Sequence, residues 1–268
     1  MQEGEAMRAR GAARWLVRQH LARLRSRPMP RALAPRGLGE AYRVQDVFAA
    51  LKARQCGPLV GHKIALTTPQ MRALVGLDAP IAGCLHARQT VEGPARVRAA
   101  DYGRLLIEFE IAFRMAEDLP ASAGPFDRAR VAAAVGEVMP AFEIADDRGA
   151  DYSTLPARGL ELAADNAWNE GAVLGEPIAD WRALDLADLR GVALRNGERV
   201  GEGRGADVMG HPLESLRWVA NHLARQGRGL RSGEVVISGS LVTSKFPAAG
   251  EAWRFDAGDL GAVELRVD

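Results

Sequence analysis

The segment LLIEFEIAFRM, residues 105–115, constrains the fold and chemistry of this chain more than any other. Strand-forming apolar residues alternate in it with two carboxylates, Glu108 and Glu110. Because side chains i and i+2 of a β-strand point to the same face, the two carboxylates project side by side. The segment therefore predicts a buried strand with one acidic face. Its other face is apolar and is expected to pack in a core: Ile107, Phe109, Ile111 and Phe113.

A third carboxylate, Glu143, lies in a similar apolar segment, VMPAFEIADD. Neighbouring carboxylates in apolar surroundings repel each other and lose hydration, which is costly without compensation. A hard divalent cation compensates, because Mg²⁺ and Mn²⁺ prefer oxygen ligands and leave positions open for water or substrate. We expect Glu108, Glu110 and Glu143 to hold such an ion. The alternative is two surface glutamates on a half-exposed strand and a third one by chance.

Composition argues against several classes of protein. With 268 residues and 47% hydrophobic content, the chain can form one large domain or one domain with a small cap. A net charge of +1 argues against a dedicated nucleic-acid binder. The two cysteines, Cys56 and Cys84, have neither metal-site nor disulfide spacing, so we expect a reducing compartment, the cytoplasm. No apolar run approaches the roughly 18–20 residues that span a membrane.

Lysine is rare in this chain. Only Lys52, Lys63 and Lys245 stand among its 35 basic residues. Where arginine is used almost everywhere, a remaining lysine can mark a place where arginine will not serve, because lysine is compact and can lose its proton when buried. Lys63 and Lys245 are the candidates, since both lie in dense apolar motifs.

The N-terminal region is basic and helical. Residues 7–37 contain nine arginines and no acid, and residues 14–27 have an amphipathic helical pattern. Three interpretations are open: a transit peptide, an arm for nucleic acid or a membrane surface, and an ordinary helix with a solvated face. We favour the ordinary helix, followed by a second helix over residues 42–54.

The rest of the chain mixes strands and helices. Strand-like segments cover residues 60–68, 81–91, 104–115 and 137–146, and helical patterns cover 69–76, 125–135 and 211–227. Residues 160–177 carry both signals. Asn196-Gly197 predicts a hairpin turn, and three short strands separated by glycines end the chain. We expect an α+β protein with an N-terminal helical region, residues 1–60, packed on a metal-binding domain, residues 61–268.

Other motifs carry less chemistry. GEGRGA at 201–206 has the glycine spacing of a dinucleotide fingerprint, but a predicted hairpin precedes it, so we expect a turn. Ser238-Gly239-Ser240 lacks the pattern of a nucleophile elbow and predicts a loop whose backbone approaches a ligand. Ser240, Thr243 and Lys245 would hold a substrate carboxylate or carbonyl there. The five histidines form no zinc pattern and are expected to be structural, with His211 capping a helix.

Seven motifs occur in an order that resembles the 2-keto-4-pentenoate hydratase and 4-oxalocrotonate decarboxylase group of the fumarylacetoacetase superfamily: GHKIALTT, VGLDAPIAGCL, IEFEIAF, VMPAFEIADDR, ADNAWNEGAVLG, GADVMGHPLESLRWVANHL and VVISGSLVTSKFPAAGEAWRFDAGDLGAVEL. The likeness runs from about residue 40 to the C-terminus. It implies a mixed, rolled β-sandwich core wrapped by helices, a homo-oligomer, and a place in aromatic-compound catabolism. It also implies Mg²⁺ or Mn²⁺ at Glu108, Glu110 and Glu143.

Proteins of this group act on unsaturated 2-oxo acids or their enols. The resemblance implies that the substrate's C1 carboxylate and C2 oxygen chelate the metal, which stabilises developing enolate charge as a Lewis acid. Lys63 would be the proton donor or electrostatic partner beside that enol. Water addition and decarboxylation both follow from the same enolate.

The chain departs from the group's pattern at two places. Hydratases of this group usually have an acidic residue eighteen positions after the motif lysine, where this chain has Ile81. The missing acid weakens the expectation of hydratase proton transfer and leaves metal chelation intact. The segment ADNAWNEG stands where hydratases often have serines, and we expect Asn166 and Asn169 to bind the substrate carboxylate instead.

These observations predict a metal-dependent, hydratase-like lyase that acts on a small unsaturated 2-oxo acid. One alternative is a decarboxylase of a 2-oxo-enedioate. Another is an acylpyruvate hydrolase, which would need a His-Glu pair that the front half of the sequence lacks. A third is a non-catalytic relative that binds metal or 2-oxo acids. We expect a small-molecule substrate, no nucleic-acid or membrane partner, and a homo-oligomer.

Overall fold

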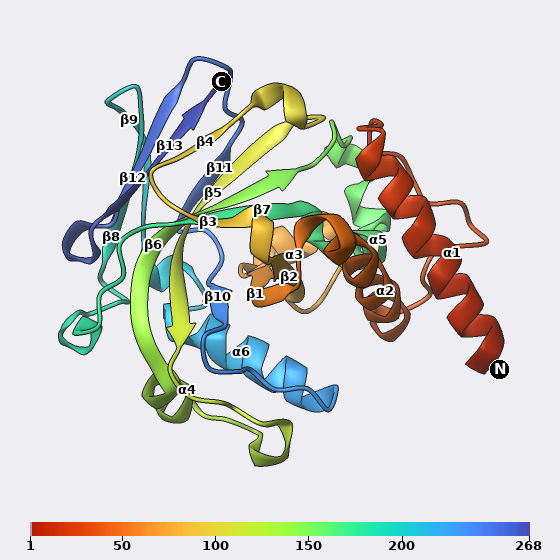
Figure 1. Ribbon diagram of the computed structural model, residues 1–268, viewed down its shortest axis with the longest axis horizontal. Coiled ribbons are helices and arrows are strands. Elements are labelled where there is room, and N and C mark those ends of the chain that lie inside the picture. The colour runs from red at the N-terminus through yellow and green to blue at the C-terminus, as the bar shows by residue number, and fades with distance from the viewer. Residues whose placement is uncertain (1) are drawn as a thin grey trace.

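The computed structural model describes residues 2–268, which form two β-sheets with helices around them (Figure 1). The larger sheet has eight strands in the order β2-β1-β10-β5-β6-β7-β3, with β11 also paired to β5. Its strands are β1 (Leu59–Ala65), β2 (Ile81–His86), β3 (Thr90–Glu92), β5 (Leu105–Met115), β6 (Val135–Asp146), β7 (Asn169–Leu174), β10 (Val235–Ile237) and β11 (Val242–Lys245). The smaller sheet has the order β4-β13-β12-β8-β9. Its strands are β4 (Ala95–Val97), β8 (Arg190–Arg195), β9 (Glu198–Arg204), β12 (Ala252–Asp256) and β13 (Ala262–Val267).

The long strands β5 and β6 form the centre of the larger sheet and pair antiparallel along their lengths. One face of this pair packs against the smaller sheet. The Phe109 ring lies 5.5 Å from that of Phe142, and 6.1 Å and 5.7 Å from the rings of Trp253 and Phe255 in β12. The other apolar residues of β5 join the same core, so the predicted apolar face is confirmed: Ile107, Ile111 and Phe113. The acidic face of β5 is therefore left on the opposite side of the sheet.

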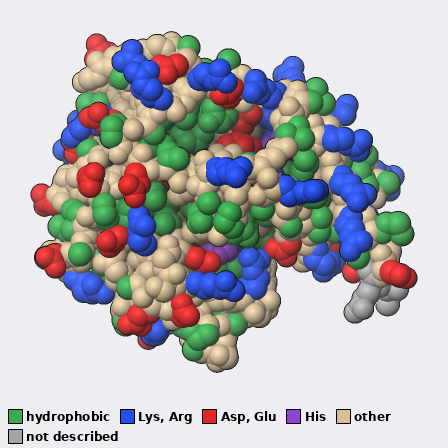
Figure 2. Space-filling model, viewed as in Figure 1, with side chains coloured by type: hydrophobic (Ala, Val, Ile, Leu, Met, Phe, Trp, Pro, Cys, Tyr) green, Lys and Arg blue, Asp and Glu red, His purple; other side chains and the backbone are tan. Residues whose placement is uncertain are grey.

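The N-terminal helices lie beside the larger sheet, away from the smaller one (Figure 1, right). α1 (Gln2–Leu21) begins before the predicted 14–27 and ends at Leu21, so residues 22–27 are not helical, whereas α2 (Leu38–Cys56) contains the predicted 42–54. With α5 (Gly159–Ala164), they form a second apolar cluster that includes Leu16, Phe48 and Leu162. Lys and Arg side chains gather on the exposed surface of this region (Figure 2). α1 is thus packed on one face and solvated on the other, which agrees with the ordinary-helix interpretation. The cluster contains residues from both sides of position 60, and a boundary there stays a prediction.

The remaining helices begin and end close to where the sequence predicts them: α3 (Pro69–Val75), α4 (Arg128–Ala134) and α6 (Pro212–Arg225). Thr68 and Asp127 cap α3 and α4 by accepting backbone N–H groups at 3.3 Å and 2.7 Å. Gly76 ends α3 with φ at 69°, a conformation that favours glycine. His211 caps α6, since its Nδ1 accepts the Leu213 N–H at 3.1 Å.

Two ambiguous segments are resolved by pairing. The strand-like residues 81–91 split into β2 and β3, because β2 pairs with β1 while β3 pairs with β7. The mixed segment 160–177 becomes α5, a 3-10 turn over Asn166–Trp168, and β7. The hairpin at Asn196-Gly197 is confirmed, with φ at 50° and 83°, and GEGRGA falls in β9 and the turn after it. No helix among residues 2–268 is long and apolar enough to cross a membrane.

Candidate metal centre and adjoining cavity

The sheet register brings the three predicted carboxylates together. Glu108 of β5 lies directly opposite Glu143 of β6 in the antiparallel ladder. Directly opposite residues share a face of the sheet, and Glu110 shares it because it lies two residues along β5. One carboxylate oxygen from each side chain lies within 4.8 Å of the others. Glu110 and Glu143 are fully buried, whereas Glu108 is half-buried.

Each carboxylate accepts a hydrogen bond from a different element. Ser244 Oγ donates to Glu108 Oε1 at 2.6 Å, and the Gly239 N–H donates to Glu110 Oε2 at 2.7 Å. Asn169 Nδ2 donates to Glu143 Oε1 at 2.9 Å. These bonds orient the carboxylates and leave other oxygens free.

Two buried carboxylate oxygens lack any hydrogen-bond partner within residues 2–268. They are Glu110 Oε1 and Glu143 Oε2. A buried oxygen without a partner is costly, because its hydration is lost and not replaced. A set of three clustered carboxylates with unsatisfied oxygens suits a hard divalent cation. The donor set therefore fits the Mg²⁺ or Mn²⁺ that the resemblance implies.

Lys63 of β1 lies beside these carboxylates. Its side chain is 2% exposed, and its Nζ lies 3.0 Å from Glu143 Oε1. Gly83 of β2, directly opposite, makes room for it, since a Cβ there would come within 2.9 Å of Lys63 Cγ. Burial disfavours its charge, but attraction from Glu143, Glu108 and Glu110 outweighs burial and raises the pKa of Lys63. Lys63 is therefore a fixed ammonium group at the centre.

The protein alone leaves negative charge at this centre poorly compensated. Burial, together with repulsion from Glu143 and Glu108, raises the pKa of Glu110 well above its usual range. Burial also raises the pKa of Glu143 to about 7, because desolvation and repulsion from Glu108 exceed the attraction of Lys63. One lysine does not offset three clustered carboxylates. The site is therefore suited to accept further positive charge.

The loop Ser238-Gly239-Ser240 approaches the centre through its backbone, as expected. Gly239 has φ at 91°, and a Cβ there would lie 2.6 Å from Thr67 Cγ2, so only glycine fits this close approach. The serine hydroxyls accept backbone N–H groups of β5: Ser238 Oγ from Ile111 at 3.2 Å, and Ser240 Oγ from Phe109 at 2.8 Å. The loop thus lies along β5 and joins β10 to β11, both of which pair with that strand.

A cavity of about 620 Å³ opens from the carboxylates. Lys63, Glu108 and Glu143 form its inner end. Of the residues predicted to bind substrate, Ser240 and Thr243 line it. Lys245 is not among the lining residues, and a Cβ built on Gly201 of β9 would lie 3.8 Å from its Nζ. Most of the remaining wall is apolar.

The two predicted asparagines have different roles in the structure. Asn169 reaches the centre through Glu143. Asn166 is directed elsewhere, because its amide binds the backbone of Cys84. Its Oδ1 accepts the Cys84 N–H at 2.7 Å, and its Nδ2 donates to the Cys84 carbonyl at 3.0 Å. Asn166 is 1% exposed and does not line the cavity. It anchors the turn before Asn169 instead.

That turn is strained. Asn166, Ala167 and Trp168 have consecutive φ values of 54°, 49° and 64°, a left-handed conformation that costs non-glycine residues energy. Ala167 and Trp168 line the cavity. The surrounding hydrogen bonds hold this turn in place, and it aims Trp168 at the cavity and Asn169 at Glu143.

A buried charge network joins α1 to the same turn. His20 Nε2 lies 2.5 Å from Asp165 Oδ1, and its Nδ1 lies 2.7 Å from Glu170 Oε1. Arg148 donates to Asp165 Oδ2 at 2.5 Å and also lies 2.8 Å from His20 Nε2, while Lys52 Nζ donates to Glu170 Oε2 at 2.8 Å. Burial disfavours charge on His20, but Asp165 and Glu170 outweigh it and raise its pKa. His20 is structural, as predicted for all five histidines, and its partners are acidic residues far along the chain.

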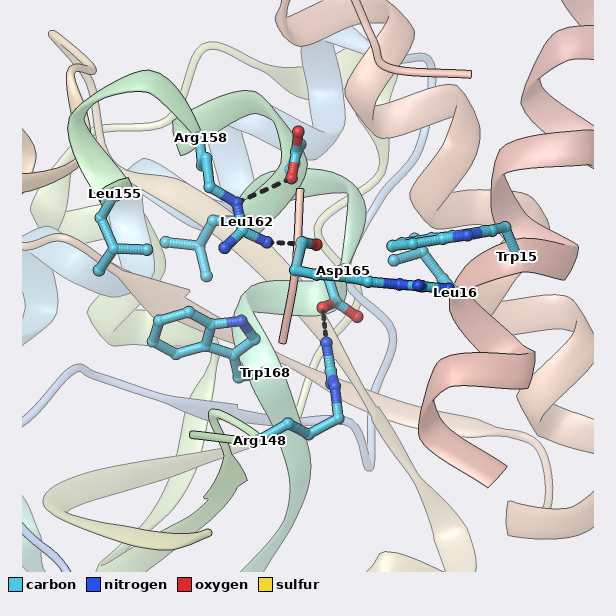
Figure 3. A pocket seen from close by; sticks show the side chains of 10 residues that line it. Trp15, Leu16, Arg148, Leu155, Arg158, Leu162, Asp165 and Trp168 are labelled. Atoms are coloured by element: carbon cyan, nitrogen blue, oxygen red, sulfur yellow. Dashed lines mark hydrogen bonds and ion pairs between the residues drawn. The ribbon is translucent and has the colours of Figure 1, made fainter. Parts of the chain in front are cut away.

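Figure 3 shows this region from close by, with Arg148 pointing at Asp165 and with Trp168, Leu155 and Leu162 beside them. These three apolar residues also line the large cavity, so they separate it from a hollow of about 20 Å³. The hollow is closed on its other side by Trp15 and Leu16 of α1. The N-terminal helix therefore supports the rear of the cavity wall.

Several residues of the site had not been identified from the sequence. Ser244 carries a hydrogen bond to Glu108, and Tyr152, Trp168 and Phe246 line the cavity. Ser244 lies in the segment LVTSKF, between Thr243 and Lys245, which the sequence predicts to bind substrate. An aromatic residue after a short polar strand was the available signal for Phe246.

The profile of the fumarylacetoacetate (FAA) hydrolase C-terminal family matches residues 71–268. The chain belongs to this family. A 2-hydroxyhexa-2,4-dienoate hydratase of Comamonas testosteroni is 34% identical over 81% of this chain and 80% of its own length. A 4-oxalocrotonate decarboxylase of Pseudomonas putida is 30% identical over 85% of this chain and 84% of its own.

The fold agrees with the family. The solved 4-oxalocrotonate decarboxylase from Pseudomonas putida G7, complexed with magnesium and adipate, matches with a TM-score of 0.88 and 27% identity, covering 97% of each chain. The predicted resemblance and the α+β fold, with mixed sheets and N-terminal helices, are confirmed. Hydratases and a decarboxylase both occur among the relatives.

Proposed function

We propose that this chain is a divalent-metal-dependent lyase, a hydratase-like enzyme for an unsaturated 2-oxo acid or its enol. The observation that carries the proposal is the group Glu108, Glu110 and Glu143, whose oxygens lie within 4.8 Å of one another at the inner end of a cavity. The unpartnered oxygens of Glu110 and Glu143 support metal binding. Lys63 beside them supports chemistry on an anionic intermediate.

The side chains at the centre have three different roles: metal binding, proton delivery and positioning of the ligands. Glu108, Glu110 and Glu143 would hold Mg²⁺ or Mn²⁺, which supplies Lewis-acid stabilisation of negative charge on the 2-oxo group. The ammonium group of Lys63 adds positive charge at a fixed position and can deliver a proton to the bound substrate. Asn169 and Ser244 hold the carboxylates in place, so that the charges are preorganised.

Decarboxylation of a 2-oxo-enedioate is the second candidate. Two observations favour it: the structural similarity to 4-oxalocrotonate decarboxylase, and Ile81, which is fully buried where hydratases usually have an acid. Decarboxylation needs an electron sink at the 2-oxo group and places fewer demands on proton transfer. We also propose a cytoplasmic enzyme that assembles as a homo-oligomer, as the resemblance implies.

A substrate screen tests the proposal. The purified chain is incubated with unsaturated 2-oxo acids, including 2-hydroxypenta-2,4-dienoate, in Mg²⁺, Mn²⁺ or EDTA. Loss of ultraviolet absorbance reports consumption of the dienol, and carbon dioxide release separates decarboxylation from hydration. We expect metal-dependent turnover that Glu108→Ala abolishes. Glu117→Ala, at a side chain that is 59% exposed, is the matched control and should retain activity. No turnover of any acid, together with no Mn²⁺ binding by calorimetry, would overturn the proposal.

A further inference from the structure

The cavity is larger and more apolar than a five-carbon acid requires. Its volume of about 620 Å³ is within the range of about 300–1,000 Å³ that is typical of pockets for larger ligands. Away from the carboxylates, its walls come from α3, from the turn beside α5 and from the segment after β11. These walls are mainly apolar: Met71, Leu74, Val75, Leu155, Trp168 and Phe246. A hydrocarbon tail would gain burial against them.

The cavity offers no positive charge for a second carboxylate. Among the described residues that line it, Lys63 is the only basic one, and it faces Glu143. With a divalent cation bound, Lys63 and the ion balance the three carboxylates, so no formal positive charge is left over. Asp207 at the rim adds an exposed negative charge.

The arginines near the cavity have other partners. Arg148 and Arg158 line the small hollow and not the cavity, and both have acidic partners: Arg148 binds Asp165 at 2.5 Å and Arg158 donates to Glu161 at 3.0 Å (Figure 3). Arg104 forms an ion pair with Asp147 and lies on the far side of the wall, with its guanidinium 4.7 Å from the centroid of the Phe246 ring. Arg72 of α3 is not among the residues that line the cavity and donates to the Leu66 carbonyl at 3.2 Å. A carboxylate at the far end of a substrate would therefore lie against apolar side chains without a cationic partner, which is unfavourable.

We infer that the substrate carries an uncharged apolar tail, an alkyl chain or ring of more than two carbons, that lies along α3. A second carboxylate at the tail end is selected against. This inference rests on the proposed function, because the 2-oxo acid end must sit at Glu108, Glu110 and Glu143. It names the class within the family's 2-oxo acids that this chain takes: monoacids with a hydrophobic tail.

Binding of two matched acids tests the inference without turnover. 2-Oxooctanoate and 2-oxooctanedioate have the same chain length and differ only in the terminal carboxylate. Isothermal titration calorimetry of each acid into Mn²⁺-loaded protein should give at least about tenfold tighter binding of the monoacid, or about 1.4 kcal/mol. Equal or tighter binding of the diacid refutes the inference alone. If neither acid binds although the protein turns over 2-hydroxypenta-2,4-dienoate, the inference fails and the proposed function stands; no turnover of any acid together with no Mn²⁺ binding overturns both.

A variant in the wall tests the position of the tail. Met71 lines the cavity from α3 and is 43% exposed, so a polar side chain is tolerated there. Met71→Lys supplies the missing cation and should shift the ratio of the two affinities by at least about fivefold toward the diacid. Met71→Gln is the neutral control of similar size and should leave the ratio near that of the wild type. An unchanged ratio in Met71→Lys would overturn the placement of the tail along α3.

Discussion

Glu110→Gln should stabilise the metal-free protein and remove most of the stabilisation that Mn²⁺ gives. Glu110 is 0% exposed, and its Oε2 accepts the Gly239 N–H at 2.7 Å while Oε1 has no partner. Glutamine keeps the acceptor for Gly239 and removes one of three clustered carboxylates. Its amide group can donate to the carboxylate of Glu143. The substitution thus relieves repulsion and an unsatisfied buried oxygen at once.

These contacts set the expected changes in the free energy of unfolding and in Tm. An unsatisfied buried polar group costs about 1–3 kcal/mol, so the free energy of unfolding in EDTA should rise by about this amount. In a protein of this size, each kcal/mol corresponds to about 2–4 °C in Tm. Wild-type protein at a Mn²⁺ concentration of 100 times Kd should gain about 2.7 kcal/mol from binding. The variant should lose most of that gain, since one of its three ligands is gone.

Thermal melts in EDTA and in Mn²⁺, with calorimetric titration of Mn²⁺, measure both effects. The matched control is Glu137→Gln in the neighbouring strand, β6. Glu137 is 38% exposed and pairs with Arg114 at 3.1 Å, so its loss should cost no more than about 1 kcal/mol and leave Mn²⁺ binding intact. A Glu110→Gln protein that melts lower than wild type in EDTA, or that keeps the wild-type Mn²⁺ shift, would refute this account of the centre.

Three further predictions concern other parts of the molecule. Lys63→Arg should lower kcat by at least about 100-fold, because the longer planar side chain cannot occupy the space beside Gly83 and delivers a proton less readily than an ammonium group; a wild-type kcat would make Lys63 a structural residue. Because the pKa of His20 is raised in the folded state, its contribution is fully present below its unfolded pKa, near 6.5, and is lost as pH rises through the higher folded value. Tm should therefore fall with rising pH above that point, and the slope should flatten in His20→Gln; equal slopes in thermal melts of both proteins would contradict this. Ile81→Asp should lower Tm more than Ile81→Asn, since Ile81 is 0% exposed in an apolar cluster, and should raise the ratio of hydration product to carbon dioxide. An unchanged ratio in a folded variant means that another residue supplies the proton.

The sequence by itself determined which side chains share a face and where most elements begin and end. The two-residue period of a strand was enough to place Glu108 and Glu110 together and to bury Phe109 on the other side. The helical pattern over residues 69–76 likewise placed α3 to within one residue of its observed end. These are local properties, because they depend on backbone geometry over a few residues.

Tertiary structure decided which segments meet. A shift of two residues between β5 and β6 would have kept the acidic faces on the same side of the sheet, but Glu143 would no longer lie opposite Glu108. The register is set by the pairing of the whole strands. Asn166 binds Cys84, 82 residues earlier, and His20 binds Asp165, 145 residues later. No local pattern specifies such partners. They follow from the packing of α1, α5 and the larger sheet, because the energy that selects them is the burial and hydrogen bonding of groups that are adjacent only after folding.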